Sequence, residues 1–427
     1  MAETDIPKKE SGSALVPKLR FPEFRGAAAW ESKRLGDLFS NRQETGLTSL
    51  QLLSLMDKEG IVPQEESNRK NNSNSDKSKY LRVVPGDIAY NTMRMWEGRS
   101  ALVGMEGLVS PAYTVCEPKP DVHSLLFSYY LKSPQLIGQF RRFSQGIVKD
   151  TLNLKYPAFA RISVLIPSYA EQQRIAYCLS SLDELIAVQA QKVEALKSHK
   201  KGLIQQLFPR AGETQPRLRF PVFQDAGEWE MRRVDERGSV LAGKALAVNA
   251  PGPLRPYLRT KNVLDGSIDL SDVLRMPMTD AEFSRFEILD GDVLLNEGQS
   301  LELVGRASIY RGEFRERCAM QNQLLRFRAF PVTCAEFAAQ YFRKCQKDGT
   351  FANVATKTTS VAHLGSSRFS ALELAWPSLS EQHRISFCLS NLDAMITAGI
   401  LKLETFKTHK KGLMQQLFPS TGGGDEI

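Results

Sequence analysis

Cysteine and histidine are scarce, and the few that occur form no metal-binding pattern. The six cysteines (116, 178, 318, 334, 345 and 388) include no pair at CxxC spacing, and the 427 residues contain only 5 histidines. Structural zinc sites need closely spaced thiolates or imidazoles, and disulfide frameworks need a patterned cysteine set in an oxidising compartment. The sequence therefore predicts no structural metal and indicates a reducing, cytoplasmic location.

Long apolar runs are also missing. No run approaches the ~18 residues that a membrane-spanning helix needs, and the start MAETDIPKKESGSA is too polar for a secretory signal. We therefore expect no membrane association. The net charge of +8 and the pI near 9.1 favour a polyanionic partner only weakly, because many cytosolic proteins are mildly basic.

Catalytic motifs are the third absence. The stretch GSVLAGKA (238–245) nearly fits a phosphate-binding loop, but Ala245 stands where Ser or Thr would hold magnesium, and no buried strand precedes it. No Gly-x-Ser-x-Gly elbow, paired metal-ligand histidines or Cys–His nucleophile stands out. The sequence predicts a non-catalytic chain with no cofactor and no metal of its own.

What the chain does contain is an internal repeat. EQQRIAYCLSSLDELIAVQAQKVEALKSHKKGLIQQLFP (171–209) returns as EQHRISFCLSNLDAMITAGILKLETFKTHKKGLMQQLFP (381–419), with about 23 identities in roughly 39 positions. Ser168 with Glu171, and Ser378 with Glu381, have the spacing of a capping box, in which hydroxyl and carboxylate each accept from a first-turn amide. Both copies end at Phe-Pro, and we predict two long helices.

Apolar residues in both copies recur in steps of three and four, which places them on one face of a helix. The residues we expect to pack are Leu179, Leu182, Ile186, Leu196, Leu389, Leu392, Ile396 and Leu403. Because a large domain separates the copies, the two helices can pair antiparallel within one chain. Dimerisation through an ordinary coiled coil is the alternative.

The duplication extends to both domains. PKLRFPEF (17–24) returns as PRLRFPVF (216–223), GDIAYN (86–91) resembles GDVLLN (291–296), and SLLFSYYLKS (124–133) resembles EFAAQYFRKC (336–345). Each half therefore reads as a lead-in, a domain and a long helix. The expected boundaries are a lead-in at 1–29, domains at 30–167 and 229–377, helices at 168–209 and 378–419, a linker at 210–228 and a flexible tail at 420–427.

Basic and amide side chains collect where loops are expected. Arginine, lysine and asparagine suit phosphates and base edges, so the candidate nucleic-acid-binding residues are Arg69, Lys70, Lys79, Asn91, Arg94, Arg99, Lys149, Arg255, Arg259, Lys261, Arg306, Lys357 and Thr358. The tract 67–79 is equally well interpreted as a disordered, solvated loop.

Together these motifs resemble the specificity subunit of type I restriction-modification systems. The resemblance is carried by the paired KKGLxQQLFP helix ends, the LRFP lead-ins, GDIAYNTMR and GLVSPAYTV in the first domain, and GDVLLNEG and MQNQLLRFR in the second. It implies an α+β architecture: two α/β target recognition domains joined by two long antiparallel helices as a coiled-coil spine, with an internal pseudo-two-fold repeat.

The resemblance also implies a function and partners. Each domain would read one half of a split, asymmetric site in double-stranded DNA, and the helices would set the gap between the halves. Two methyltransferase subunits and the restriction (translocase and nuclease) subunits would be the protein partners. S-adenosylmethionine, ATP and magnesium would be bound by those partners. The rivals are a coiled-coil scaffold without sequence-specific DNA binding and a self-contained DNA-modifying enzyme.

Overall fold

The computed structural model describes residues 16–56, 60–67, 75–146, 148, 151–245, 249–357 and 361–419. The chain divides into two compact units. Unit 1 runs to Ala190 and takes up the chain again from Leu401, and unit 2 comprises Gln191–Ile400. Residues 68–74 of the polar tract, which include Arg69 and Lys70, and the tail 420–427 lie outside the described residues. The expectations for them stay predictions.

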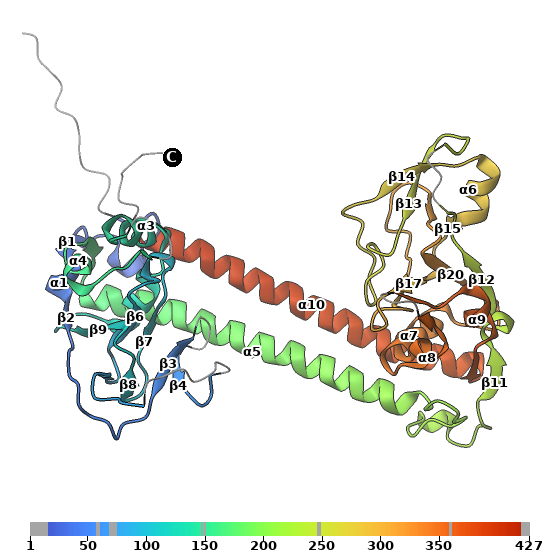
Figure 1. Ribbon diagram of the computed structural model, residues 1–427, viewed down its shortest axis with the longest axis horizontal. Helices are drawn as coiled ribbons and strands as arrows, with labels where there is room; N and C mark the ends of the chain where they lie inside the picture. Colours follow the sequence, from blue (N-terminus) through green and yellow to red (C-terminus); the bar gives the residue numbers. More distant parts are fainter. Residues whose placement is uncertain are drawn as a thin grey trace, which may run out of the picture. The chain divides into compact units, whose positions relative to one another are not determined.

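Unit 1 is built on a four-stranded antiparallel sheet (Figure 1). Its order is β2-β9-β6-β7, formed by Phe39–Asn41, Tyr113–Pro118, Ile88–Asn91 and Ser100–Leu102. Three two-stranded pairs surround it: β1 (Glu31–Arg34) with β10 (Ser163–Ile166), β3 (Leu53–Met56) with β4 (Gly60–Pro63), and β5 (Leu81–Val83) with β8 (Gly107–Val109). Its short helices are η1 (Pro22–Phe24), α1 (Leu35–Leu38), η2 (Met95–Glu97), α2 (Ser124–Tyr130), α3 (Pro134–Phe143) and α4 (Tyr156–Phe159).

Unit 2 repeats this plan. The main sheet has the order β12-β20-β16-β18, formed by Gly238–Ala242, Leu324–Ala329, Val293–Asn296 and Ala307–Ile309. The second sheet has the order β14-β13-β19-β15, formed by Leu274–Pro277, Leu254–Leu258, Cys318–Met320 and Glu287–Ile288. Its counterpart in unit 1 is the two pairs β4-β3 and β8-β5, which a parallel bridge between Leu52 and Leu108 joins in the same order. The remaining strands are β11 (Glu230–Arg233), paired with β23 (Glu373–Trp376), and the sheet β17 (Gly298–Gln299), β22 (Ala362–His363) and β21 (Thr356–Lys357). The short helices are η4 (Pro221–Phe223), η5 (Val234–Glu236), α6 (Asp280–Phe286), α7 (Ala335–Lys347), α8 (Thr350–Val354) and α9 (Ser366–Ala371).

These elements confirm the repeat landmarks. The two GD motifs lead into β6 and β16, and the two amphipathic segments form α2 and α7. The stretch that nearly fits a phosphate-binding loop (238–245) contains strand β12. Gly243 follows this strand directly, and a Cβ there would lie 2.2 Å from the carbonyl oxygen of Gln321. That close packing leaves no loop to cradle a phosphate. The sheets are mostly antiparallel with the helices set apart, which is the α+β arrangement.

The long helices are α5 (Tyr169–Leu207) and α10 (Leu379–Leu417), and each begins in one unit and ends in the other. The capping-box prediction is half right. The hydroxyls of Ser168 and Ser378 accept from the amides of Glu171 and Glu381 at 3.4 Å. The two carboxylates do not turn back to the helix start, because each binds an arginine of the LRFP lead-in.

This arginine–glutamate pair explains the repeated lead-in. Arg20 donates to Glu171 at 2.8 and 2.6 Å, and Arg219 donates to Glu381 at 2.8 and 2.7 Å. Both carboxylates are 1% exposed. The hydrogen bonds hold the pKa of each arginine above its ordinary value. Bidentate, buried pairs of this kind fix geometry strongly, so each lead-in is locked onto the first turn of a long helix.

Within each unit the two long helices run antiparallel. In unit 1, Asp183 binds Lys410 at 2.6 Å, and Ile175 and Leu179 share a core with Leu417 and Phe418. Going forward along α5 therefore means going backward along α10. Unit 2 mirrors this with Lys200 on Asp393 at 2.6 Å, and with Leu207 and Phe208 in the core. Pairing of the helices within one chain is confirmed.

The predicted apolar stripe is buried to different depths. Leu179 and Leu389 are fully buried against their domains. The other six residues of the stripe are half-buried: Leu182, Ile186, Leu196, Leu392, Ile396 and Leu403. A two-helix pair covers each apolar side chain from one side only, whereas the domains enclose the helix ends.

The expectation about apolar runs needs a correction for α10. This helix is long enough to cross a membrane and contains a window of mean hydropathy 1.2, of which 22% is buried. The sequence reading missed it because small polar residues interrupt the run without adding charge. Part of the apolar surface of α10 is exposed, as at Phe387 and Met395.

Two leucines on α5 test this packing. Leu179→Ala should lower the free energy of unfolding by about 2–5 kcal/mol, because it opens a cavity in the core of unit 1. Leu185→Ala is the matched control, since Leu185 is 50% exposed and its loss should cost less than about 0.5 kcal/mol. Urea unfolding of the purified chain measures both. Equal losses would contradict the burial pattern.

Candidate nucleic-acid interface

Three segments meet in unit 1 at the end of the central strands of the main sheet, where β6 ends and β9 begins. Thr92 follows β6, and its backbone amide donates to the carbonyl of Ala112 at 3.1 Å in the turn before β9. The carbonyl of Thr92 accepts from Leu154 at 2.8 Å. Just before Leu154, Asn153 forms an antiparallel bridge with Gln145. We call the post-β6 loop, the 110–112 turn and the antiparallel pair of Gln145 and Asn153, referred to as the hairpin of unit 1, the loop edge of unit 1.

Unit 2 has the same edge, built by the same backbone bonds. The amide of Glu297, after β16, donates to the carbonyl of Gln323 at 2.8 Å in the turn before β20. The carbonyl of Glu297 accepts from Leu364 at 2.9 Å, next to the hairpin of β21 and β22. The loop edge of unit 2 is therefore the post-β16 loop, the 321–323 turn and the antiparallel pair of strands β21 and β22, referred to as the hairpin of unit 2. The backbones correspond although their side chains differ.

A buried aspartate anchors the turn that leads into the central strand of each unit, β6 or β16, at the opposite end of that strand from the loop edge. Asp87 and Asp292 are each 1% exposed and accept from a backbone amide in their turn, Val84 at 3.0 Å and Leu289 at 2.7 Å. Arg42 binds Asp87 at 2.8 Å, and Arg328 binds Asp292 at 2.7 Å. Burial raises the pKa of Asp87, and the hydrogen bonds from Arg42 oppose that rise. Arg42 directly follows β2, whereas Arg328 lies on β20. The equivalent aspartates of the two units are therefore paired with arginines from different places in the fold.

Beyond β6, the chain of unit 1 exposes basic and apolar groups. The Asn91 side chain accepts from the Met93 amide at 3.0 Å, which tightens the turn. Met93 is 47% exposed, and the Arg94 side chain is 52% exposed. Arg94 and Arg99 both bind Glu97, at 3.4 and 3.0 Å. Exposed ion pairs of this kind are weak, so a phosphate or a base edge can replace Glu97 as the partner of Arg94.

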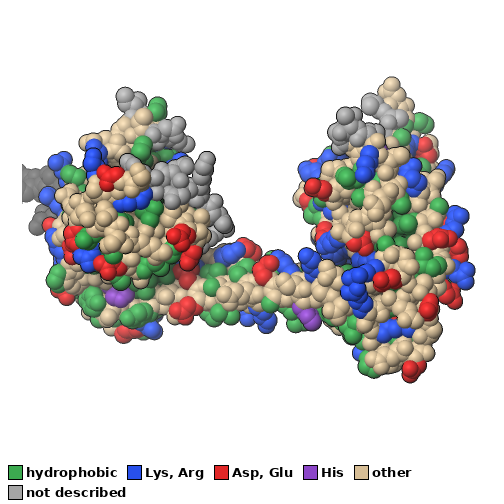
Figure 2. Space-filling model, turned by 60° about the horizontal axis from the view of Figure 1, so that its bottom comes forward, with side chains coloured by type: hydrophobic (Ala, Val, Ile, Leu, Met, Phe, Trp, Pro, Cys, Tyr) green, Lys and Arg blue, Asp and Glu red, His purple; other side chains and the backbone are tan. Residues whose placement is uncertain are grey.

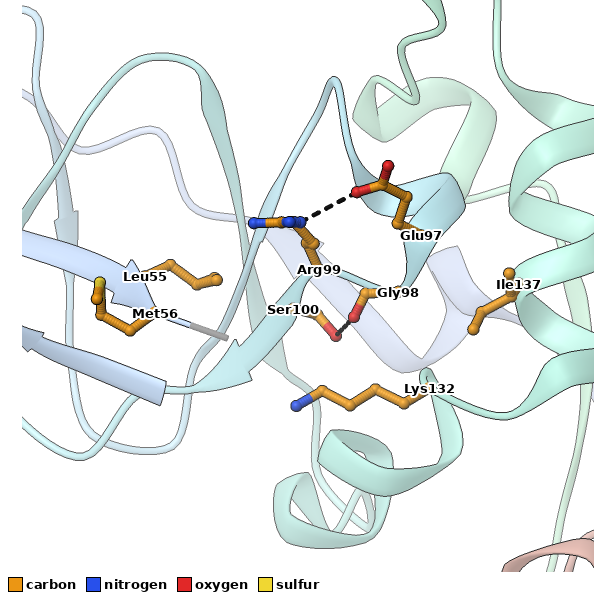
Figure 3. A pocket seen from close by; sticks show the side chains of 8 residues that line it. All are labelled: Leu55, Met56, Glu97, Gly98, Arg99, Ser100, Lys132 and Ile137. Atoms are coloured by element: carbon orange, nitrogen blue, oxygen red, sulfur yellow. Dashed lines mark hydrogen bonds and ion pairs between the residues drawn. The ribbon is translucent and has the colours of Figure 1, made fainter. Parts of the chain in front are cut away.

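A hollow of about 340 Å³ lies beside this loop. Arg99 and Lys132 reach into it from opposite sides, with Ser100 between them, as Figure 3 shows. Gly98 keeps it open on the α3 side, because its φ is +78° and a Cβ there would lie 3.1 Å from Ile137. The other lining residues are Leu55, Met56 and Glu97. Two cationic walls favour an anionic group here over an apolar ligand.

The charge of the surface is mixed. Figure 2 shows Lys and Arg side chains interspersed with Asp and Glu on the face drawn of each unit. The net charge of +8 is therefore dispersed on that face. Long-range attraction to a polyanion is modest in such an arrangement, so selectivity depends on particular side chains at the loop edges.

Comparison with protein families decides what kind of chain carries these edges. The family model described as "Type I restriction modification DNA specificity domain" matches residues 28–198 and again residues 227–405. The chain belongs to this family. The two matches coincide with the two halves of the internal repeat, so the duplication is one of whole specificity domains.

Curated relatives match at low identity. The MjaVIII specificity subunit of a type I restriction enzyme from Methanocaldococcus jannaschii is 25% identical over 175 residues, covering 39% of this chain and 40% of the relative. The EcoKI specificity subunit from Escherichia coli is 22% identical over 289 residues, covering 64% and 59%. The matched region thus spans about half the length of these relatives.

Solved structures show the same fold. The S subunit of a type I restriction-modification system from M. genitalium aligns with a TM-score of 0.56 at 13% identity, covering 95% of this chain and 99% of that one. A chain from a structural study of the assembly and conformational transition of a type I system aligns with a TM-score of 0.55 at 14% identity, covering 92% and 98%. At such identities the likeness concerns the fold alone.

The predicted binding residues of this specificity-domain chain fall into three groups. Asn91, Arg94 and Arg99 lie on the loop edge of unit 1 or directly beside it. Lys357 is exposed on the hairpin of unit 2. Lys149 and Thr358 lie outside the described residues, as do Arg69 and Lys70, and Lys79 is exposed near the end of the polar tract.

The remaining predicted residues lie in unit 2, in or near its second sheet, β14-β13-β19-β15. Arg259 follows Leu258, whose carbonyl accepts from Gln321 in the 321–323 turn at 2.9 Å. Arg259 and Lys261 both bind Asp272, at 2.5 and 2.9 Å. Arg255 binds Asp280 at 2.6 Å and covers the ring of Phe283. Arg306 is partly buried and donates to the carbonyl of Val263 at 3.0 Å, so its side chain already has a structural role.

Sequence reasoning missed several residues of the loop edges. Glu297, Gln323 and His363 converge in unit 2, and Lys132 lines the hollow in unit 1. The repeated asparagines Asn91 and Asn296 located the first loop of each edge. The two hairpins share no sequence that would have located them. Among the described residues, no group of three His, Cys, Asp or Glu side chains could hold a metal ion.

Arg42 tests the anchoring of the turn before β6. Arg42→Met leaves Asp87 buried without its cation, and breaking such a pair should cost about 3–5 kcal/mol. The pKa of Asp87 then rises further in the folded protein. A carboxyl with a raised folded-state pKa loses stability as pH rises, so the deficit should be smaller at about pH 5 than at about pH 8.

Arg82→Met is the matched control for Arg42→Met. Arg82 binds Glu44 and Glu106 on the surface, and removing exposed pairs should cost less than about 1 kcal/mol. Chemical unfolding at the two pH values measures both variants. A deficit for Arg42→Met that matches the control, or that grows on acidification, would contradict the anchoring role.

Proposed function

We propose that this chain is the non-catalytic, DNA-recognition subunit of a type I restriction-modification enzyme. Each unit reads one half of a split, asymmetric site in double-stranded DNA through its loop edge. The observation that carries the proposal is the pair of loop edges: one backbone arrangement, held by equivalent hydrogen bonds, presents different side chains in the two units. Two readers of two different half-sites require that combination.

Membership of a DNA specificity family supports the proposal, and so does the chemistry of the edges. Exposed Arg94 and Lys357 suit phosphates and guanine edges, while Asn91 and Gln323 carry amides of the kind that pair with adenine. Methyl transfer, ATP hydrolysis and cleavage belong, in this proposal, to partner subunits that bind S-adenosylmethionine, ATP and magnesium. The subunit works in the cytoplasm, where its DNA target and those partners are found.

The long helices offer a surface for the methyltransferase partners. Tyr177 and Phe387 occupy equivalent positions of the repeat and are 55% and 62% exposed. Leu185 and Met395 are likewise equivalent and are 50% and 51% exposed. Exposed apolar side chains that recur at matched positions mark interaction sites better than scattered ones do. One such surface in each unit fits two copies of one partner, which supports the proposed pair of methyltransferase subunits.

Expression of the complete system in a host tests the function, with the methylated motif read by sequencing. We expect a bipartite motif. Arg94→Ala should weaken recognition of one half, and Arg259→Ala the other, each by about 1–3 kcal/mol if the arginine contacts a base. Lys33→Ala is a control, since Lys33 is exposed on β1 and remote from the loop edge in the sheet order.

The scaffold alternative makes the opposite prediction. A coiled-coil scaffold would give no sequence motif and no salt-dependent, sequence-selective retention of DNA by the assembled complex. If an arginine variant instead lowers affinity equally for all sequences, that arginine contacts phosphate and reads no base. A host without any bipartite motif would overturn the proposed function.

A further inference from the structure

Three side chains of unit 2 converge on one small residue of the loop edge. Glu297, Gln323 and His363 come from the post-β16 loop, the turn before β20 and strand β22. His363 Nδ1 lies 3.1 Å from Glu297 Oε2. A Cβ on Gly298 would lie 2.3 Å from the amide oxygen of Gln323 and 3.1 Å from the His363 ring. Glycine at position 298 therefore allows the three side chains to come together.

The backbone correspondence identifies their counterparts in unit 1. Glu297 and Thr92 make the same two backbone hydrogen bonds, to Gln323 and Leu364 in unit 2 and to Ala112 and Leu154 in unit 1. Gln323 therefore corresponds to Ala112. His363 and Asn153 each end the second arm of a hairpin and each precede a fully buried leucine, so they also correspond.

The two sets of three positions are unlike in size and chemistry. Unit 2 carries a carboxylate, an amide and an imidazole, while unit 1 carries a hydroxyl, a methyl and an amide at the corresponding places. The side chains of His363 and Glu297 are 36% and 15% exposed, and Asn153 and Gln323 are partly buried. Asn153 Oδ1 is buried and has no hydrogen-bond partner among the described residues, and the Thr92 hydroxyl donates to the carbonyl of Ala112 at 2.8 Å. Glu297 and His363 are therefore reachable from the surface, and Asn153 holds an acceptor that the fold leaves unpaired.

We propose that these three matched positions, 297, 323 and 363 in unit 2 and 92, 112 and 153 in unit 1, determine which bases each unit reads. The inference rests on the proposed function and specifies how that function is carried out. Positions whose backbone is fixed by the frame, while their side chains differ, can change the target without changing the fold. The surrounding arginines contribute affinity from the phosphates.

The chemistry of Glu297 gives unit 2 a defined preference. An ionised carboxylate only accepts hydrogen bonds. His363 binds Oε2, which leaves Oε1 available to accept from an exocyclic amino group in the major groove. Cytosine N4 and adenine N6 are such donors, whereas guanine O6 and thymine O4 are acceptors that a carboxylate repels. One position of the second half-site is therefore an amino-bearing base, A or C, on the strand that faces Glu297.

Glu297→Gln is the sharpest test, because the amide has nearly the shape of the carboxylate and adds an N–H₂ donor. We would reconstitute the complex with its methyltransferase and measure binding to duplexes that carry each of the four bases at every position of both half-sites. At one position of the second half-site, the preference between A and C should shift about tenfold or more toward adenine, because an amide pairs bidentately with adenine whereas the carboxylate accepts equally well from either amino group. Discrimination throughout the first half-site should stay unchanged.

Two further variants complete the experiment. Asn153→Ala should lower discrimination in the first half-site only, because Asn153 is the counterpart of His363 in unit 1. Glu373→Gln is the matched control: Glu373 is exposed on β23, which pairs with β11 and not with the loop edge. Its binding profile should equal that of the unaltered chain at every position.

Several outcomes would overturn the assignment. Glu297→Gln could leave every position of the second half-site unchanged, could lower affinity equally for all duplexes, or could alter the first half-site. Each result would show that Glu297 is not the reader. If the unaltered complex discriminates no sequence at all, the proposed function itself fails, and the reading positions fall with it. Intact discrimination in the first half-site reports that a variant has folded.

Discussion

The main hydrophobic core of each unit is completed by a helix end that belongs to the other copy of the repeat. Leu207 and Phe208 end the helix that starts in unit 1, yet they lie in the core of unit 2, where Phe208 packs edge-on against Trp229 at 6.3 Å between ring centroids. Phe418 ends the second helix and stacks on Tyr130 of unit 1 at 4.5 Å. Aromatic contacts this well buried contribute strongly to stability. Neither domain can therefore keep an intact core without the helix that arrives from the other half.

This mutual dependence fixes the frame and leaves the loops free to differ. The frame is held by features present in both copies: the Arg20–Glu171 and Arg219–Glu381 pairs, the Lys–Asp pairs between helices, and the buried aspartates in the turns before β6 and β16. The second sheet of unit 2 is continuous, whereas its counterpart in unit 1 is two strand pairs joined by a single bridge, and the loop edge of unit 2 carries larger and more polar side chains. Because these differences lie outside the shared core, a change of target need not alter stability.

Much of the frame follows from the sequence, because it rests on periodicity and repetition. The apolar stripe predicts the long helices, and the recurrence of LRFP predicts the same lead-in before each domain. The partner of that motif could not be predicted. Glu171 and Glu381 fit a capping box by spacing, but only three-dimensional packing shows that Arg20 and Arg219 take their carboxylates. Spacing along the chain carries no information about a partner roughly 150 residues away.

The loop edges were the least predictable part for a similar reason. Asn91 and Arg94 could be proposed because they follow a recognisable strand. The hairpins of unit 1 and unit 2 correspond only through backbone hydrogen bonds, so Asn153 and His363 carried no signal in the sequence. Arg306 shows that charge in the sequence does not reveal a structural partner. Its charge suggested a nucleic-acid contact, but its guanidinium supports the carbonyl of Val263 inside the domain.

The central claim is that one duplicated frame holds two independent readers of DNA. The most direct test is to replace residues 30–167 with the matching domain of a relative that has a different target, and to sequence the methylated motif in cells that express the complete system. The account predicts that one half of the bipartite motif changes to that of the relative while the other half stays the same. A change in both halves together, or loss of all recognition by a chain that still folds, would contradict it.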